Sequence, residues 1–415
     1  MQSRRVFLKQ GAFACVSLGF APSFLARTAF AADATRRRKQ LIAIFQRGAV
    51  DGLSVVVPFA EPDYQRARPR IAVGRPGTGD EAAIDLDGFF GLNPRLAPLK
   101  PWWDAQQLAI VHACGSPDST RSHFDAQDYM ETATPGVKST ADGWLNRYLQ
   151  ARRDAEPGPF RAVALTSQMP RMLQGHAPAL AVSQLGQFSL RGGRATAQAG
   201  ASFEEAYAAA RDQVLNGTAR EAFEAMRRLE AVDPARYQPA NGADYPRSPF
   251  GQALRQIAQL TKADVGLEVA FAEIGGWDTH VNQGSTRGQL AARLDDFGRT
   301  IAALAADLGD RLADTVILTM SEFGRAVNEN GSGGTDHGHG NAMMVIGGGV
   351  RGGRVYARWP GLAVEQRYER RDLAVTTDFR DVFGEIVTRH LGVADAASIF
   401  PGYPIAPSRF PGLFA

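Results

Sequence analysis

Four apolar runs organise this sequence, and each passes directly into a polar loop. Runs of this length that are rich in branched side chains are typical of strands buried on both faces of a mostly parallel sheet. Helical patterns lie between them, for example over residues 288–309, where apolar residues recur at helical spacing. This alternation predicts an α/β fold, an α/β/α sandwich with a mostly parallel central sheet. The runs are residues 41–45, 108–114, 267–274 and 315–320.

The loops that leave these runs are rich in residues that carry chemistry. They read QRGAVDG, GSPDSTRSH, GGWDTH and SEFGR. In parallel α/β sheets, ligands bind beyond the carboxyl ends of the strands, and this is where all four loops emerge. The sequence therefore predicts one functional site at which the loops converge.

The N-terminus predicts a twin-arginine signal peptide over residues 1–31. Arg4 and Arg5 precede a short apolar run, and Ala29-Phe30-Ala31 is a small-x-small cleavage site. The pattern indicates export by the twin-arginine machinery, to the periplasm or outside the cell, rather than a membrane anchor. A basic amphipathic helix is the alternative interpretation.

The mature chain, residues 32–415, is expected to be a single domain. Residues 202–232 read as a helical hairpin, interpreted as an inserted cap because no flexible linker sets it apart. The mature chain holds 42 basic and 43 acidic residues, and its basic cluster at 36–39 reads as a solvated leader, so no nucleic-acid partner is expected. Cys114 is its single cysteine, which excludes an intramolecular disulfide, and no apolar run is long enough for a membrane span.

Two loops offer residues that suit metal binding. Residues 333–340 read GGTDHGHG and contain Asp336, His337 and His339, in a chain with seven histidines. Carboxylate and imidazole together suit zinc, manganese or iron, and glycine lets the backbone fold tightly around an ion. Taken alone, the stretch also fits a hydrogen-bonded surface turn.

The loop GGWDTH adds Asp278 and His280, whose spacing puts both side chains on one side of an extended segment. The alternative is that Asp278 caps a turn and His280 is merely exposed. Asp51 follows the first apolar run in the sequence VDG, where an ordinary Asp-Gly turn is the competing interpretation.

The loop SPDSTRSHF contains hydroxyls ahead of a predicted helix, and at least one of these should be an ordinary helix cap. The functional interpretation is that one hydroxyl, activated by metal, attacks an ester while Arg121 holds the anion. Glu322 and Arg325, in SEFGR, are either a buried ion pair or a ligand and an anion clamp. The hydroxyls are those of Ser119, Thr120 and Ser122.

One glycine-rich stretch is a misleading match. GGGVRG, residues 347–352, fits the dinucleotide-binding glycine pattern, but the following GRVYARW reads as a strand rather than a helix. A hairpin turn is therefore the expected structure.

Four stretches resemble the uncharacterised bacterial family called domain of unknown function 1501, and the twin-arginine leader fits that family too. The resemblance covers essentially the whole mature chain, and its last stretch is long enough to be highly specific. More distantly, the family resembles the alkaline phosphatase and sulfatase superfamily, which implies an alkaline-phosphatase-like sandwich with two metal sites at the strand ends. The stretches are residues 47–59, 121–133, 275–283 and 319–353.

By this resemblance, Asp51 matches an aspartate after the first strand, and Asp336 with His337 match an Asp-His pair at the same metal. The nucleophile that shares this site would be Ser119 or Thr120, with Ser122 as a further candidate.

The resemblance also implies a second metal, held by Asp278 and His280. The superfamily's pair is commonly spaced Asp-x-x-x-His, whereas this chain has Asp-x-His. A later histidine usually completes the set, and the candidates are His339 and His390, the latter in what reads as an ordinary helix end. The implied cofactors are divalent ions such as zinc, manganese or calcium.

Together these features favour an exported, metal-dependent hydrolase of phosphate or sulfate esters, acting on a small anionic substrate through a metal-activated Ser or Thr nucleophile. The alternative is an exported binding or assembly protein that keeps the fold without catalysis. An oxidoreductase is suggested only by the export route, because the chain has no cysteine cluster and no convincing dinucleotide loop.

Overall fold

The computed structural model describes residues 38–152, 160–185 and 236–415. The predicted signal peptide at 1–31 and the predicted helical cap at 202–232 lie outside these residues. Lys39–Ala415 form one compact unit, which is the unit described below.

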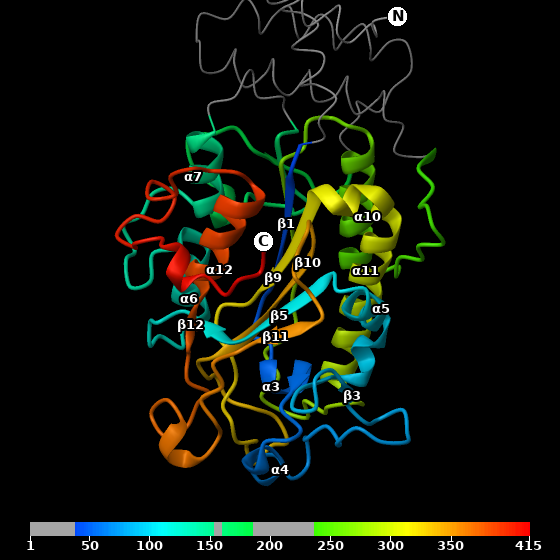
Figure 1. Cartoon of the computed structure of the whole chain (residues 1–415), viewed down its shortest axis with the longest axis vertical. Coiled ribbons are helices and arrows are strands. Elements are labelled where there is room, and N and C mark those ends of the chain that lie inside the picture. The colour runs from blue at the N-terminus through cyan, green and yellow to red at the C-terminus, as the bar shows by residue number, and fades with distance from the viewer. Residues whose placement is uncertain (1–37, 153–159, 186–235) are drawn as a thin grey trace, which may run out of the picture. The chain divides into compact units, whose positions relative to one another are not determined.

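The central sheet is mostly parallel (Figure 1). Its strand order is β11-β5-β10-β9-β1-β8-β6-β7, and β12 also pairs with β5. Every pairing in it is parallel except those of β10, which runs antiparallel to both β5 and β9. The strands are β1 Gln40–Gln46, β5 Leu108–Gly115, β6 Ala162–Ala164, β7 Leu180–Ala181, β8 Val269–Ile274, β9 Thr315–Met320, β10 Asn341–Gly347, β11 Arg354–Tyr356 and β12 Thr377–Asp378.

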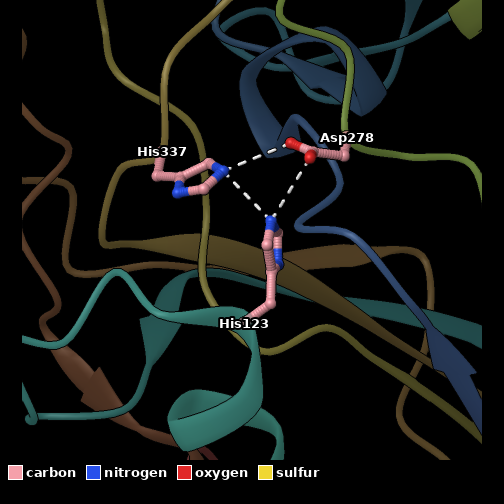
Figure 2. Close-up of side chains that lie close together, drawn as sticks. All are labelled: His123, Asp278 and His337. Atoms are coloured by element: carbon pink, nitrogen blue, oxygen red, sulfur yellow. Dashed lines mark hydrogen bonds and ion pairs between the residues drawn. The ribbon is translucent and has the colours of Figure 1, made fainter.

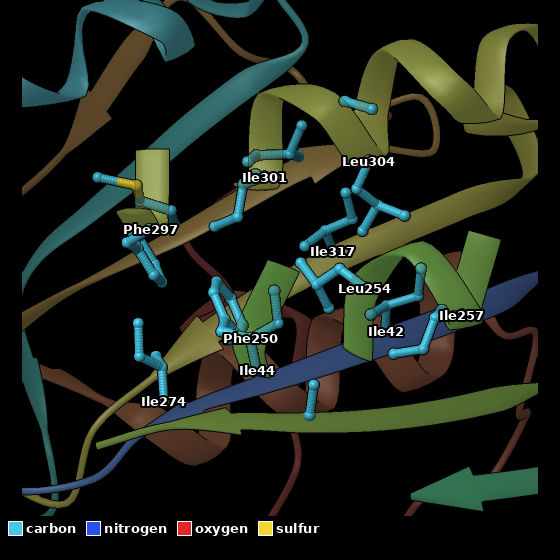
Figure 3. Close-up of a cluster of buried hydrophobic side chains, with 14 of the residues drawn as sticks. Ile42, Ile44, Phe250, Leu254, Ile257, Ile274, Phe297, Ile301, Leu304 and Ile317 are labelled. Carbon is cyan, nitrogen blue, oxygen red and sulfur yellow. The ribbon is translucent and has the colours of Figure 1, made fainter. Parts of the chain in front are cut away.

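Strand β1 shows how both faces of the sheet are buried. Its residues alternate between two hydrophobic clusters, with Leu41 and Phe45 in one and Ile42 and Ile44 in the other. Ile42 and Ile44 pack with helices α10 (Pro249–Lys262) and α11 (Gln289–Leu308), as Figure 3 shows. Leu41 and Phe45 share the other cluster with helices α7 (Trp144–Ala151) and α12 (Phe379–Glu385).

The protein is therefore an α/β/α sandwich with a mostly parallel sheet, which confirms the predicted fold class. All four apolar runs are strands of this sheet, and the predicted helix at 288–309 is α11. Its apolar residues, such as Leu294, Phe297 and Ile301, recur at helical spacing and bury one face of the helix on the sheet. Within the described ranges, none of the helices combines the length and apolar character that crossing a bilayer requires.

Strand order brings the polar loops to one edge. Strands β9, β1 and β8 are parallel neighbours, so the loops after them begin side by side. Because β10 runs antiparallel to β9, the loop that precedes β10 lies at the same edge. Strand β5 is antiparallel to β10 and pairs its end, at Cys114, with Asn341 at the start of β10. The loop after β5 therefore joins the others.

The prediction of a hairpin at 347–352 was wrong. A strand, β11, does follow the glycines, but it pairs in parallel with β5 rather than with β10. The connecting segment crosses the start of β5, where Gly352 N–H donates to the Gln106 carbonyl and Gly353 N–H to the Leu108 carbonyl. A β-like run after a turn predicts a strand, but its pairing partner depends on the rest of the sheet.

Shorter elements complete the described fold. A second, antiparallel sheet has the strand order β2-β4-β3. Its strands are β2 Val56–Val57, β3 Ile84–Asp85 and β4 Gly91–Leu92. The remaining α-helices of the described residues are α3 Gly52–Val55, α4 Pro62–Ala67, α5 Lys100–Asp104 and α6 His123–Thr132. The helix that the sequence predicts after the hydroxyl-rich loop is α6.

Candidate metal centre

Three side chains from three strand-end loops point toward one another at the sheet edge (Figure 2). His123 is the first residue of α6, Asp278 follows β8, and His337 precedes β10. His337 Nε2 lies 3.0 Å from His123 Nε2 and 3.2 Å from Asp278 Oδ1. His123 Nε2 lies 3.5 Å from Asp278 Oδ2. Each residue thus offers one possible ligand atom, and these atoms lie within 4.8 Å of one another.

His280 adds a fourth donor. Its Nε2 lies 2.9 Å from His337 Nε2 and 3.0 Å from Asp278 Oδ1. We call His123, Asp278, His280 and His337 the histidine cluster.

Hydrogen bonds fix which ring nitrogen of each histidine faces the cluster. His337 Nδ1–H donates to the main-chain carbonyl of Arg121, 2.9 Å away. His123 Nδ1 lies 2.8 Å from Glu322 Oε1, and His280 Nδ1 lies 3.3 Å from Asp336 Oδ1. An Nδ1–H that points at an oxygen leaves the lone pair on Nε2, which is how metal-ligating histidines are commonly oriented.

The residues present fit a bound metal ion. Bare Nε2 lone pairs that meet at 2.9–3.0 Å repel each other unless a proton or a metal cation lies between them. Zn–N bonds of 2.0–2.1 Å in a tetrahedral site separate ligand atoms by about 3.3 Å. The separations among the ligand atoms of His123, Asp278 and His337, 3.0–3.5 Å, surround this value.

The electrostatics of the cluster follow from its neighbours. The hydrogen bond to Glu322 raises the pKa of His123, whereas burial, followed by the charge on His123, lowers the pKa of His337. Burial opposes ionisation of Asp278, but its hydrogen bond to Arg325 holds the pKa of this carboxyl below the usual value. A metal ion bound at His123 Nε2 would compete with a proton for that nitrogen.

The cluster is open on one side. The Asp278 side chain is 46% exposed and that of His280 is 39% exposed, whereas those of His123 and His337 are mostly covered. A ligand from solvent can therefore reach this side of the cluster.

Arg325 ties the loops of the cluster together. Its fully buried guanidinium donates to Asp278 Oδ1 at 2.6 Å and lies 3.5 Å from His280 Nε2. The sequence left open an ion pair between Glu322 and Arg325, but the structure pairs Arg325 with Asp278 and Glu322 with His123. The Arg325 guanidinium also donates to main-chain carbonyls of three different loops, namely those of Gly48, Ala49, Trp277 and Thr335.

Asp336 and His339 occupy different positions from their neighbour His337. Asp336 Oδ1 accepts from Asn330 Nδ2 and contacts His280 Nδ1, so it orients a possible ligand. His339 is buried and stacks on Tyr368, with ring centroids 4.1 Å apart, and burial lowers its pKa to about 4. The structure does not bring the His339 ring into the histidine cluster.

Asp51 is also outside the cluster. It is buried and forms a two-point ion pair with Arg68, whose Nη1 and Nη2 lie 2.5 and 2.9 Å from the carboxylate oxygens. Ser54 and Gln283 donate to the same carboxylate. Although burial opposes ionisation, the Arg68 guanidinium lowers the pKa of Asp51. This carboxylate is already satisfied by protein donors.

The predicted nucleophile loop lies beside the cluster. Thr120 Oγ1 accepts from Ser122 N–H, and Ser122 is the N-cap residue of α6 without a capping bond from its hydroxyl. Ser119 and Ser122 are exposed. In the part of the chain that the structure describes, none of these three hydroxyls is hydrogen-bonded to the histidine cluster.

Arg121 is not placed as an anion clamp. Its guanidinium donates to Glu369 at 2.6 Å and to Asp372 at 2.7 Å. Its main-chain carbonyl, by contrast, accepts the His337 Nδ1–H bond. The site contribution of Arg121 in this structure is therefore made by its backbone.

His123 is the site residue that the sequence analysis did not select as a ligand. It stands at the end of the loop SPDSTRSHF, whose hydroxyls and arginine drew the functional interpretation. A histidine at the first helical position after a strand-end loop was the signal that could have identified it.

Comparison with known proteins identifies the family. Residues 105–397 match the family described as "Protein of unknown function (DUF1501)", which covers more than half of the chain, and the protein belongs to this family. No curated protein matches the chain.

Among solved structures, the chain is similar to "Crystal Structure of Phosphonate Monoester Hydrolase of Agrobacterium radiobacter". The match covers 88% of this chain and 78% of that chain, at 10% identity and a TM-score of 0.34. This likeness is distant, and we base the fold on the strand order and the site on its own contacts.

Proposed function

We propose that the histidine cluster binds a divalent metal ion and that the protein is a metal-dependent hydrolase of phosphate or sulfate esters. The carrying observation is the convergence of His123, His280 and His337, each with Nδ1 facing an oxygen and Nε2 facing the Asp278 carboxylate or another Nε2. Asp278, His280 and His337 were predicted ligands, and His123 joins them in this proposal.

The charges around the cluster favour a dication. The carboxylates of Asp278, Asp336 and Glu322 contact its histidines, and Arg325 is the guanidinium that contacts Asp278. Three negative charges and one positive charge leave two negative charges, which a divalent ion would balance. Imidazole donors favour zinc, whereas manganese and calcium are better suited to oxygen ligands.

Support for an anionic ester comes from α6. His123 is the first residue of this ten-residue helix, so free N–H groups and the positive end of the helix dipole lie beside the cluster. When bound, the metal would polarise an ester oxygen and activate an attacking hydroxyl or water. The chain itself would supply orientation through Arg325 and Asp336, and Ser119, Thr120 and Ser122 remain the proposed nucleophiles.

The competing proposal is a non-catalytic binding or assembly protein in which the metal is structural. The exposure of Asp278 and His280 favours the hydrolase, because an ester from solvent could reach an ion held there. A panel of phosphate and sulfate esters separates the two proposals. A metal-loaded protein that turns over none of them would favour the non-catalytic one.

We also propose export by the twin-arginine machinery, on the basis of Arg4 and Arg5 and the cleavage site at Ala29–Ala31. Replacing both arginines by lysine should leave unprocessed protein in the cytoplasm, as seen by cell fractionation. Unchanged processing in that variant would contradict this proposal.

The metal is tested with a matched pair of histidines from one loop. His337→Gln removes a cluster nitrogen, and His339→Gln removes a ring that stacks on Tyr368. Elemental analysis of purified protein should find a divalent metal in the wild type and in His339→Gln and little in His337→Gln. Ester turnover should likewise be retained in the wild type and in His339→Gln and be lost in His337→Gln. Equal metal content in all three proteins, or none in the wild type, would overturn the proposal.

A further inference from the structure

Glu322 is a buried carboxylate directly behind a cluster histidine. It follows β9 by two residues, and its side chain is completely buried. Its Oε1 accepts from Gly48 N–H at 2.8 Å and from Gln127 Nε2 at 2.9 Å, and it lies 2.8 Å from His123 Nδ1. Its Oε2 accepts from the Ser321 hydroxyl at 3.0 Å.

These contacts give Glu322 an unusual environment. Among the described residues, His123 is its only ion-pair partner, because its other donors are an amide, a hydroxyl and a main-chain N–H. A buried carboxylate without an arginine or lysine partner costs stability. The donors Gly48, Gln127 and Ser321 also hold it rigidly, and they leave His123 as the group whose orientation it can set.

We propose that Glu322 is the positioning residue that fixes His123 as an Nε2 metal ligand. This inference rests on the proposed metal site and deepens it by naming the residue outside the ligand set that determines donor strength. Glu322 accepts the Nδ1–H of His123, so it holds the ring orientation and makes Nε2 a stronger donor. Its own oxygens are occupied by protein donors, so it acts through His123 and not as a ligand.

The experiment compares Glu322→Gln with Glu329→Gln in the full mature chain. Glu329 is a control because it accepts from the backbone of Arg70 and Ile71 and pairs with Arg70, away from the histidine cluster. Zinc affinity is measured by competition with a chelating dye, and ring-nitrogen NMR shows which nitrogen of His123 is bound. Glu322→Gln should weaken zinc binding by roughly 10- to 100-fold and lose the defined Nδ1–H signal, and Glu329→Gln should do neither.

A merely structural role for Glu322 predicts a different outcome. The thermal midpoint in chelator would then fall in Glu322→Gln, while zinc affinity and the His123 tautomer stayed at wild-type values, and that result would overturn the inference. Should Glu322→Gln fail to fold, Gln127→Met removes one donor to Oε1 and should weaken zinc binding in the same direction by a smaller factor. Unchanged zinc affinity in Gln127→Met would then contradict the positioning role of Glu322.

Failure of the metal proposal gives a distinct result. In that case wild-type protein binds no zinc, whereas failure of the Glu322 inference leaves zinc binding intact in Glu322→Gln. The NMR experiment on metal-free wild type reads the His123 Nδ1–H directly. Absence of that proton, or its persistence unchanged in Glu322→Gln, would overturn the positioning role whether or not zinc binds.

Discussion

His337 donates its Nδ1–H to the main-chain carbonyl of Arg121 across 2.9 Å. The loop after β5 thereby orients a ring that belongs to the loop before β10, and it does so with a backbone atom. The guanidinium of the same Arg121 is held by Glu369 and Asp372. The sequence suggested that the Arg121 side chain holds an anion, but Arg121 contributes to the site through its main-chain carbonyl.

Replacing Arg121 separates these two roles. Arg121→Gln keeps the carbonyl and loses an exposed ion pair with Glu369 and the nearer ion-pair partner of the buried Asp372. We therefore expect zinc affinity within a few-fold of wild type but a loss of about 3 kcal/mol in unfolding free energy. Ester turnover should fall less than about tenfold, because no transition-state contact is removed. A loss of a thousandfold or more in kcat/KM would instead support the clamp role.

The Asp51–Arg68 pair predicts a stability effect without a metal effect. Asp51→Asn leaves the buried Arg68 without its counter-ion, and breaking a buried pair in this way costs about 3–5 kcal/mol. Denaturant unfolding should show this loss, while elemental analysis should find the metal content of the folded fraction unchanged. An Asp51→Asn protein that is stable but contains no metal would show instead that Asp51 is a metal ligand.

Asp278→Asn predicts a loss of metal. Asp278 is about half exposed, and its replacement removes the carboxylate that contacts His280, His337 and the buried Arg325. Metal content and ester turnover should both be lost. Normal metal content in this variant would place the ion elsewhere.

Acid should destabilise the protein through His112. Burial lowers the pKa of this histidine to about 4, although the hydrogen bond from Nε2–H to the Val56 carbonyl opposes the shift. Nδ1 accepts from Ala113 N–H, so the folded ring has no place for a second proton. The unfolded chain takes up that proton near pH 6.5. Stability is thus lost as pH falls from about 6.5 to 4, by up to about 3 kcal/mol, and is constant in this respect above that window.

Urea unfolding across this pH range measures the effect. His112→Gln lacks the titrating ring, so its unfolding free energy should be lower at pH 7 but should fall less steeply between pH 6.5 and 4. An equal slope in both proteins would show that His112 is not responsible. His390, also buried with a pKa lowered to about 4, would be the next candidate.

Much of the fold could be predicted from the sequence because the signal is local. Branched apolar runs such as residues 41–45 have few alternatives to a strand buried on both faces, and α11 is marked by its apolar spacing. The partner of a strand within the sheet, by contrast, is determined by residues far away in the sequence. The pairing of β11 with β5 depends on which edge of the sheet was free, and no residue near 350 encodes that.

The site was predictable in part for the same reason. Asp278 and His337 could be identified because a strand-end loop places its polar residues at the sheet edge. Asp51 satisfied the same rule, but its partner Arg68 is 17 residues away and reaches it through a fold that the sequence pattern does not describe. His339 lies two residues past His337, but its ring stacks on Tyr368, a contact between distant parts of the chain that the local pattern does not encode.

Anomalous X-ray diffraction from crystals of metal-loaded protein tests the central claim most directly. Data collected on both sides of the metal's absorption edge locate the ion without assuming its ligands. The proposed site predicts one strong peak bounded by His123 Nε2, Asp278 and His337 Nε2, with His280 beside it. A peak at Asp51 or His339, or no peak in protein saturated with zinc and with manganese, would contradict it.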